Sequence, residues 1–587
     1  MTIAHRPIAV AIVFASGVAA SSLIGCNSGV PPADLVLTNG KVVTVDSAGP
    51  EAQAIAIRAD TIAAVGTVEE IDRLIGPQTH VIDLEGRLAI PGFIEGHAHF
   101  MSLGRSKLIL DLTKTRSWDE IVDMVEEAVE GAQPGEWITG RGWHQEKWAS
   151  VPDGAVDGVP THHSLSKVSP ENPVYLRHAS GHASFVNAAA MRRSAISAET
   201  PNPPGGEIIR DVRGRPTGHL RENAQRAVSR AIRADLSRRT DEEIVAEKYR
   251  QAELASRESL EKGITSFHDA GVSFETVDFF RTLVDEDRLP LRLYVMVREN
   301  PASLKERLAD YWMLDYGGML TVRSVKQVID GALGSHGAWL IEPYEDLPST
   351  SGLNTTPIDS IRLAAVIALA NGFQLNTHAI GDRGNRVMLD IYEESFDRHR
   401  DRHRDTDTDT DTDRRWRIEH AQHLHPDDIV RFGELGVIAS MQAVHQTSDA
   451  SWVPKRIGEK RSREGAYMWQ SLWQSGAVVT NGTDAPVEDV DPIPSFYASV
   501  SRRSNDGTVF YPDERLSREQ ALQAYTINNA YAAFQEDRLG SISVGKWADI
   551  TVLSRDIMTI PEDEILDTRV LYTIVGGKIA YQAKPHE

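Results

Sequence analysis

The residues of this sequence best suited to chemistry are histidines and one aspartate that follow apolar, strand-like runs. His97 and His99 come directly after the run PGFIEG, and His378, His420 and Asp484 each follow a further run of this kind. Residues i and i+2 of a strand point to the same face, so His97 and His99 can address one metal ion. Alone, an H-x-H pair could be two polar residues at a strand end. Four strand ends with ligand-type residues predict a metal site.

Eight strand-like runs alternate with helical patterns between residue 89 and residue 483. Parallel βαβ units follow from such alternation, and eight of them predict an α/β fold of the (β/α)8 TIM-barrel type. Chemistry in such a barrel lies at the carboxyl ends of the strands, which is where the histidines and the aspartate occur. The expected strands are residues 89–94, 264–267, 291–297, 322–329, 373–377, 415–419, 437–441 and 478–483.

The rest of the chain predicts three further parts. Short strand patterns at both chain ends lead us to expect one small β-sandwich domain, built from residues 26–88 and 540–587, beside a barrel domain at 89–539. Residues 103–260 exceed a simple crossover, so we expect an insertion that covers the barrel mouth. Residues 397–414 alternate Arg, His, Asp and Thr, which predicts a solvated low-complexity loop.

Charge and the first residues bear on partners and location. The formal charge of −22 argues against nucleic acid, since phosphate binding needs clustered Lys and Arg. Residues 1–25 have the layout of a secretory signal, and LIGC, which ends at the only cysteine, Cys26, resembles a bacterial lipobox. We expect a lipid anchor on Cys26 that holds the protein at the periplasmic side of a bacterial membrane, in the cell envelope. The alternative is a plain secretory signal with an incidental cysteine.

The motifs together resemble those of a known superfamily. PGFIEGHAH, VKQVIDGALGS, NTHAIGD, RIEHAQ, NGTDAPV and GSISVGKWADITVL are similar to segments of the metal-dependent amidohydrolases. The resemblance is greatest to amidohydrolase family 3, the branch that contains N-substituted formamide deformylases. It spans about residues 33–582, nearly the whole mature chain.

The resemblance implies a ligand set and a reaction. One or two divalent ions, zinc by preference, would be held by His97, His99, His378, His420 and Asp484, with Lys326 carboxylated to a bridging carbamate. A metal-bridged hydroxide would then be the nucleophile, with Asp484 as the proton shuttle. The substrate would be a small amide-type molecule, N-acyl or N-formyl amines included, cut at a carbon–nitrogen bond other than a peptide bond. An ordinary ion-paired Lys326 and a mononuclear site are the alternatives.

Other residues and other functions stay open at this point. Arg141, Trp143, His182, Asp330 and His336 lie in stretches that match the family and are candidates for substrate binding, with structural roles as the alternative. A metal- or solute-binding lipoprotein without activity is a second hypothesis, and a phosphoester hydrolase on the same scaffold is a third. Base deamination ranks lower, because His378 is followed by AIGD, without the glutamate of that pattern.

Overall fold

The computed structural model describes residues 31–143, 145, 148–150, 154–156, 159–178, 183–203, 206–237, 239–334, 336–403 and 413–584. The expected signal and lipidation site at Cys26, and the candidate residue His182, lie outside these ranges. None of the helices within them combines the length and apolar character needed to cross a bilayer.

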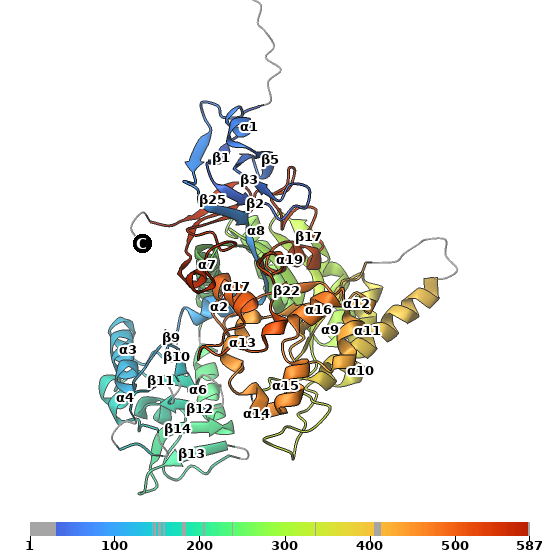
Figure 1. Cartoon of the computed structure of the whole chain (residues 1–587). Coiled ribbons are helices and arrows are strands. Elements are labelled where there is room, and N and C mark those ends of the chain that lie inside the picture. Colours follow the sequence, from blue (N-terminus) through green and yellow to red (C-terminus); the bar gives the residue numbers. More distant parts are fainter. Residues whose placement is uncertain are drawn as a thin grey trace, which may run out of the picture.

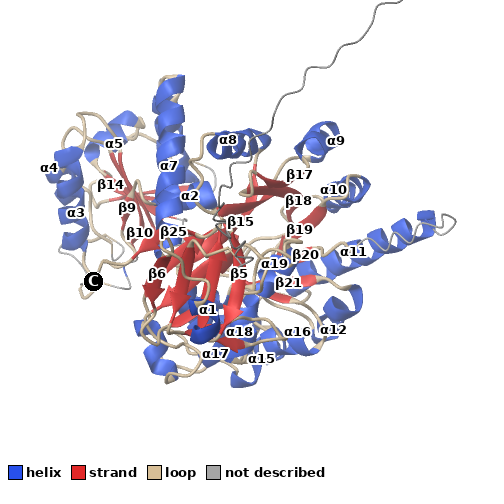
Figure 2. Ribbon diagram, turned by 90° about the horizontal axis from the view of Figure 1, so that it is seen from above, coloured by secondary structure: helices blue, strands red, loops and turns tan. Residues whose placement is uncertain are grey.

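Eight parallel strands form the centre of the molecule, as predicted (Figures 1 and 2). Each strand pairs in parallel with the next along the chain, which is the order of a TIM barrel. The strands are β8 (Phe93–Ala98), β15 (Ile264–Val272), β16 (Arg292–Val297), β18 (Leu320–Val328), β19 (Gln374–Ala379), β20 (Arg417–His420), β21 (Ile438–Met441) and β22 (Val479–Asn481).

The first and last strands are joined by single hydrogen bonds rather than by a ladder. The side chain of Asn529 donates to the carbonyls of Ile94 (2.6 Å) and Asn481 (2.9 Å), and the N–H of Asp484 donates to the carbonyl of His97 (2.7 Å). These bonds draw β8 and β22 together and nearly close the barrel. They also bring His97 and Asp484, the first and last predicted ligands, side by side.

The predicted first strand, residues 89–94, is wrong in one respect. The chain breaks at Gly92 into β7 (Leu88–Pro91), which belongs to another sheet, and β8. A side chain at Gly92 would clash with Thr265, so the bend needs the close approach that glycine permits. An apolar run that continues across the break hides it from sequence patterns.

Helices cover the outside of the barrel (Figure 2). Thr240 and Glu243 form a capping box at the start of the longest of the fully described helices, and Gly436 ends another in the left-handed conformation. The helices are α7 (Asp241–Glu261), α8 (Phe274–Asp285), α9 (Pro301–Arg307), α10 (Ile358–Ala370), α11 (Asp382–His403), α12 (Pro426–Leu435), α16 (Trp469–Gln474), α17 (Pro492–Ser501), α18 (Arg518–Ala524) and α19 (Ile527–Ala532).

The two chain ends form two further sheets, and the second of these combines strands from both ends. One contains β1 (Leu35–Thr38), β4 (Ala54–Arg58), β5 (Thr61–Gly66) and β6 (His80–Asp83), with α1 (Val68–Asp72) beside it. The other contains β2 (Lys41–Val43), β3 (Glu51–Ala52), β7, β23 (Ile550–Leu553), β24 (Val570–Val575) and β25 (Lys578–Gln582). A shared apolar cluster joins them. Whether they form a sandwich in the strict sense stays a prediction.

The segment between the first two barrel strands starts with α2 (Phe100–Ser106) and then forms a sheet of its own, at the lower left of Figure 1. The sheet contains β9 (Leu110–Asp111), β10 (Ile138–Trp143), β11 (Val174–His178), β12 (Ala183–Val186), β13 (Gly206–Arg210) and β14 (Pro216–Glu222). Its helices are α3 (Trp118–Gly131), α4 (His163–Val168), α5 (Ala188–Arg193) and α6 (Arg226–Leu236).

The low-complexity segment is partly helical, which corrects the loop expected from residue 397. Helix α11 continues to His403, and an ion pair between Arg398 and Glu394, one helical turn apart, supports the extension. Residues 404–412 lie outside the described part. The earlier turns of α11 have a buried apolar face, and the helix that they begin continues into the segment for which composition alone predicts a loop.

Candidate metal centre

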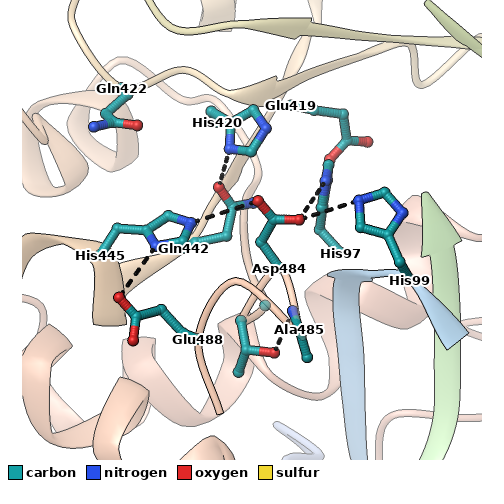
Figure 3. Close-up of polar contacts among 12 residues, drawn as sticks. His97, His99, Glu419, His420, Gln422, Gln442, His445, Asp484, Ala485 and Glu488 are labelled. Carbon is teal, nitrogen blue, oxygen red and sulfur yellow. Dashed lines mark hydrogen bonds and ion pairs between the residues drawn. The ribbon is translucent and has the colours of Figure 1, made fainter. Parts of the chain in front are cut away.

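The two ends of the barrel sheet meet at a cluster of ligand-type side chains (Figure 3). His97, at the end of β8, is 1% exposed, and its Nε2 lies 3.7 Å from Oδ1 of Asp484. His99, the residue before α2, places Nε2 3.2 Å from the same oxygen. Three ligand atoms lie within 4.8 Å of one another, one each from His97, His420 and Asp484. That spacing is short enough for one ion to contact all three.

The fourth, fifth and sixth strands supply the rest of the predicted set. The ring of His420 lies 4.8 Å from that of His97 and 4.4 Å from that of His378, measured between centroids. Nζ of Lys326, a residue on β18 that is 3% exposed, lies 3.3 Å from Nε2 of His97. The structure therefore brings all six predicted residues into one neighbourhood.

Two partners that sequence patterns did not predict orient the imidazoles (Figure 3). Glu419 bonds Nδ1 of His97, and Oε1 of Gln442 lies 2.6 Å from Nδ1 of His420. With Nδ1 engaged, Nε2 of each ring is the atom left for a metal, which is the arrangement typical of metal-binding histidines. Nε2 of His378 and Oδ1 of Asp484 are buried without a hydrogen-bond partner among the described residues. The residues present therefore fit a divalent ion.

The charges at the site favour metal binding. Burial first, and then the charge of Lys326, lowers the pKa of His378 to about 3, so its imidazole is neutral and available as a ligand. The pKa of Asp484 lies well below its ordinary value, because the neighbouring imidazoles of His445 and His99 outweigh the effect of burial. Burial lowers the pKa of Lys326 to about 8. The site thus holds the neutral imidazole of His378 near an ionised carboxylate.

The backbone that carries the ligands is held in uncommon conformations. His420 and Asp484 have φ values of 77° and 57°, in the left-handed region that side chains rarely adopt. Buried Glu95 fixes the second of these turns, since it accepts hydrogen bonds from the N–H groups of Thr483 (2.8 Å) and His97 (3.0 Å). Glu95 lies within the apolar run that forms β8, and no sequence pattern indicated this role.

A second unpredicted pair lies on the other side of Asp484. Nε2 of His445, on α13 (Ala443–Asp449), is 3.7 Å from Oδ2 of Asp484, and Nδ1 is 3.9 Å from Oε1 of Glu488 (Figure 3). Burial opposes charge on His445, but both carboxylates outweigh it and raise its pKa to about 10. Asp484 therefore lies between the ligand histidines and a cationic imidazole. A lone histidine outside any motif gave no signal.

The predicted substrate-binding residues fall in different places. Asp330 lies 3.5 Å from Nε2 of His378 and accepts hydrogen bonds from the N–H groups of three residues, which ties it to the site. Trp143 lies in the apolar cluster of the inserted sheet and donates its indole N–H to the carbonyl of Leu176 (2.9 Å). His336 pairs with Asp346 at 3.1 Å. Arg141 is half-buried on β10.

Comparison with known proteins places this geometry in a family. The model of the amidohydrolase family matches residues 80–581. The chain belongs to the amidohydrolase family. Among the similar proteins, Protein LONG AFTER FAR-RED 3 of Arabidopsis thaliana is 35% identical, over 94% of this chain and 92% of that protein. N-substituted formamide deformylase of Arthrobacter pascens is 27% identical, over 94% of this chain and 98% of the enzyme.

A solved structure agrees with the amidohydrolase assignment. An uncharacterized metal-dependent hydrolase from Pyrococcus furiosus has a TM-score of 0.70 and 28% identity, and the match covers 89% of this chain and 100% of that one. The chain therefore shares its fold with a solved metal-dependent hydrolase.

Proposed function

We propose that this amidohydrolase-family protein is a metal-dependent hydrolase of carbon–nitrogen bonds other than peptide bonds, acting on small N-acyl or N-formyl amines. The observation that carries the proposal is the convergence of six ligand-type residues at the carboxyl ends of five barrel strands, with Glu419 and Gln442 orienting two of the imidazoles. The formamide deformylase relative supports the choice of bond.

The residues of the site would have two roles, metal binding and proton transfer. His97, His99, His378, His420 and Asp484 would hold the ion or ions, with zinc suited to this nitrogen and oxygen donor set. A bound divalent ion supplies Lewis acidity and lowers the pKa of a water ligand. Asp484 would take the proton from the attacking water and return it to the leaving nitrogen, since its carboxylate is ionised and borders the ligand histidines.

Lys326 is proposed to carry a carbamate that bridges two ions. Carboxylation needs a neutral amine, and the pKa of about 8 that burial gives Lys326 makes the neutral form accessible near neutral pH. The amine lies 3.3 Å from the ligand nitrogen of His97, so the added group would reach the ligand cluster. Intact-mass measurement should find an adduct of one carbon dioxide that Lys326→Arg abolishes.

We propose in addition that the mature chain is anchored by lipid on Cys26 at the periplasmic side of a bacterial membrane. The support is the sequence of residues 1–26.

A small-molecule amide is the proposed substrate.

The test is an amide panel assayed with zinc-loaded protein. Wild type should release amine from N-formyl or N-acetyl substrates, and Asp484→Asn should lower kcat by a factor of about 100 or more, the range lost with a general acid–base group. Glu393→Asn, an exposed carboxylate on α11 that pairs with Arg431, is the control and should leave kcat unchanged. Zinc bound at full stoichiometry without turnover on any amide would instead support a binding protein.

A further inference from the structure

Arg298, at the carboxyl end of a barrel strand, has no carboxylate partner among the residues that the structure describes. Arg298 follows β16 directly, is exposed, and its side chain makes no hydrogen bond or ion pair within the part of the chain that the structure describes. Many arginines elsewhere are paired, for example Arg292 with Asp549, Arg386 with Asp428 and Arg415 with Glu536. In a chain of net charge −22, an unpaired arginine at the site calls for an explanation.

Gly271 places Arg298 beside the metal centre. A Cβ built on this glycine would lie 3.2 Å from Cδ of Arg298 and 3.2 Å from Cγ of Lys326, so both side chains pass over its α-carbon. The φ of Gly271, 129°, is also one that residues other than glycine rarely adopt.

We infer that the substrate carries an anionic group, in the simplest case a carboxylate, which Arg298 binds beside the metal centre. A planar guanidinium matches a carboxylate with two parallel hydrogen bonds. A bound anion would also relieve the repulsion between neighbouring cations. The inference rests on the proposed function and narrows it to amides that bear a negative charge.

The test compares two substrates that differ only in the carboxylate: racemic N-formylphenylalanine and N-formylphenethylamine. Zinc-loaded wild type should favour the first in kcat/KM by about tenfold or more, the range expected for a hydrogen bond between charged groups. Arg298→Gln should lose this preference through a higher KM for N-formylphenylalanine. Arg298→Lys should restore part of it, because the charge returns without the bidentate geometry.

A matched control and a binding measurement separate the possible failures. Arg281→Gln, on the outer helix α8, removes one exposed charge elsewhere and should change nothing. Calorimetry with 3-phenylpropionate, which cannot be hydrolysed, should show binding about tenfold weaker in Arg298→Gln than in wild type. Equal turnover of both amides, or equal binding of the carboxylate by wild type and Arg298→Gln, would overturn the inference. Absence of turnover on every amide would overturn the proposed function, and the calorimetry would still decide whether Arg298 binds anions.

Discussion

At the scale of single residues, the site is defined as much by the partners of the ligands as by the ligands. Glu419 is fully buried, and the charges of His97 and Lys326 overcome its burial and lower its pKa to about 2. It therefore stays ionised and holds Nδ1 of His97, which leaves Nε2 directed at Asp484 and Lys326. Metal affinity should depend on this contact although Glu419 is not expected to touch the metal.

Glu419→Gln should weaken zinc binding by a factor of about 10 to 100, the usual effect of removing a partner that orients a ligand histidine. The amide can still accept or donate one hydrogen bond but loses the charge. Competition against a chromophoric chelator measures the change. Glu394→Gln, on the exposed face of α11, is the control, and equal affinity in Glu419→Gln and wild type would contradict the assigned role.

His423 makes a second prediction, concerning pH. It is 2% exposed with neither ring nitrogen bonded within the described part of the chain, and burial lowers its pKa to about 3. The unfolded chain, with an ordinary pKa near 6.5, binds this proton first on acidification. The contribution of His423 to folding is therefore complete above about pH 6.5 and is lost as pH falls towards 3, by at most about 1.4 kcal/mol per pH unit.

The measurement is the melting temperature of metal-free protein at pH 7.5 and pH 5.5. His423→Gln should lose less stability between the two than wild type does, because an amide does not titrate in this range. His425→Gln, at a half-buried position nearby, is the control. An identical pH dependence in His423→Gln and wild type would show that His423 is not buried in its neutral form.

At the scale of elements, α2 connects the metal centre to the outer layer of the barrel. The helix begins directly after His99, and Gly104 within it lies against the backbone of α7. A Cβ at Gly104 would clash with the carbonyl oxygen of Gln251. The position of His99 therefore depends on two helix backbones in close contact.

Gly104→Ala should destabilise the protein by about 1–3 kcal/mol, because the added methyl group forces α2 away from α7. A lower melting temperature and weaker zinc binding are both expected, since α2 carries His99 at its start. Gly131→Ala, in the last turn of α3 with open space around its α-carbon, should be neutral or slightly stabilising. Equal behaviour of the two variants would contradict the packing described for α2.

The elements also show what sequence can and cannot predict. The eight strands and the predicted ligands at their ends follow from local patterns. The apolar residues of each strand indicate that it is buried, and the type of each ligand residue indicates what it can bind. Glu419, Gln442 and Glu95 could not be found in this way, since their roles depend on which neighbouring strands bring them to a particular imidazole or turn. The break at Gly92 was missed for a similar reason: only the approach of Thr265 requires it.

At the scale of the whole molecule, the account couples metal binding to the closure of the barrel. His97 and Asp484 lie on the first strand and just beyond the last, and the backbone N–H of Asp484 already donates to His97. An ion held by both would stabilise the folded chain, by about 2.7 kcal/mol when free zinc is one hundred times the dissociation constant. Chelation should lower the melting temperature, and zinc should restore it. An unchanged melting temperature on chelation would contradict the coupling.

The zinc content of purified wild type and His420→Ala, measured by plasma mass spectrometry, tests the central claim most directly. His420 is 6% exposed and lies between His97 and His378, so wild type should carry one or two ions per chain and the variant at least one fewer. His425→Ala, five residues further along and only half-buried, should keep the wild-type content. Equal zinc in wild type and His420→Ala would contradict a metal centre at these strand ends.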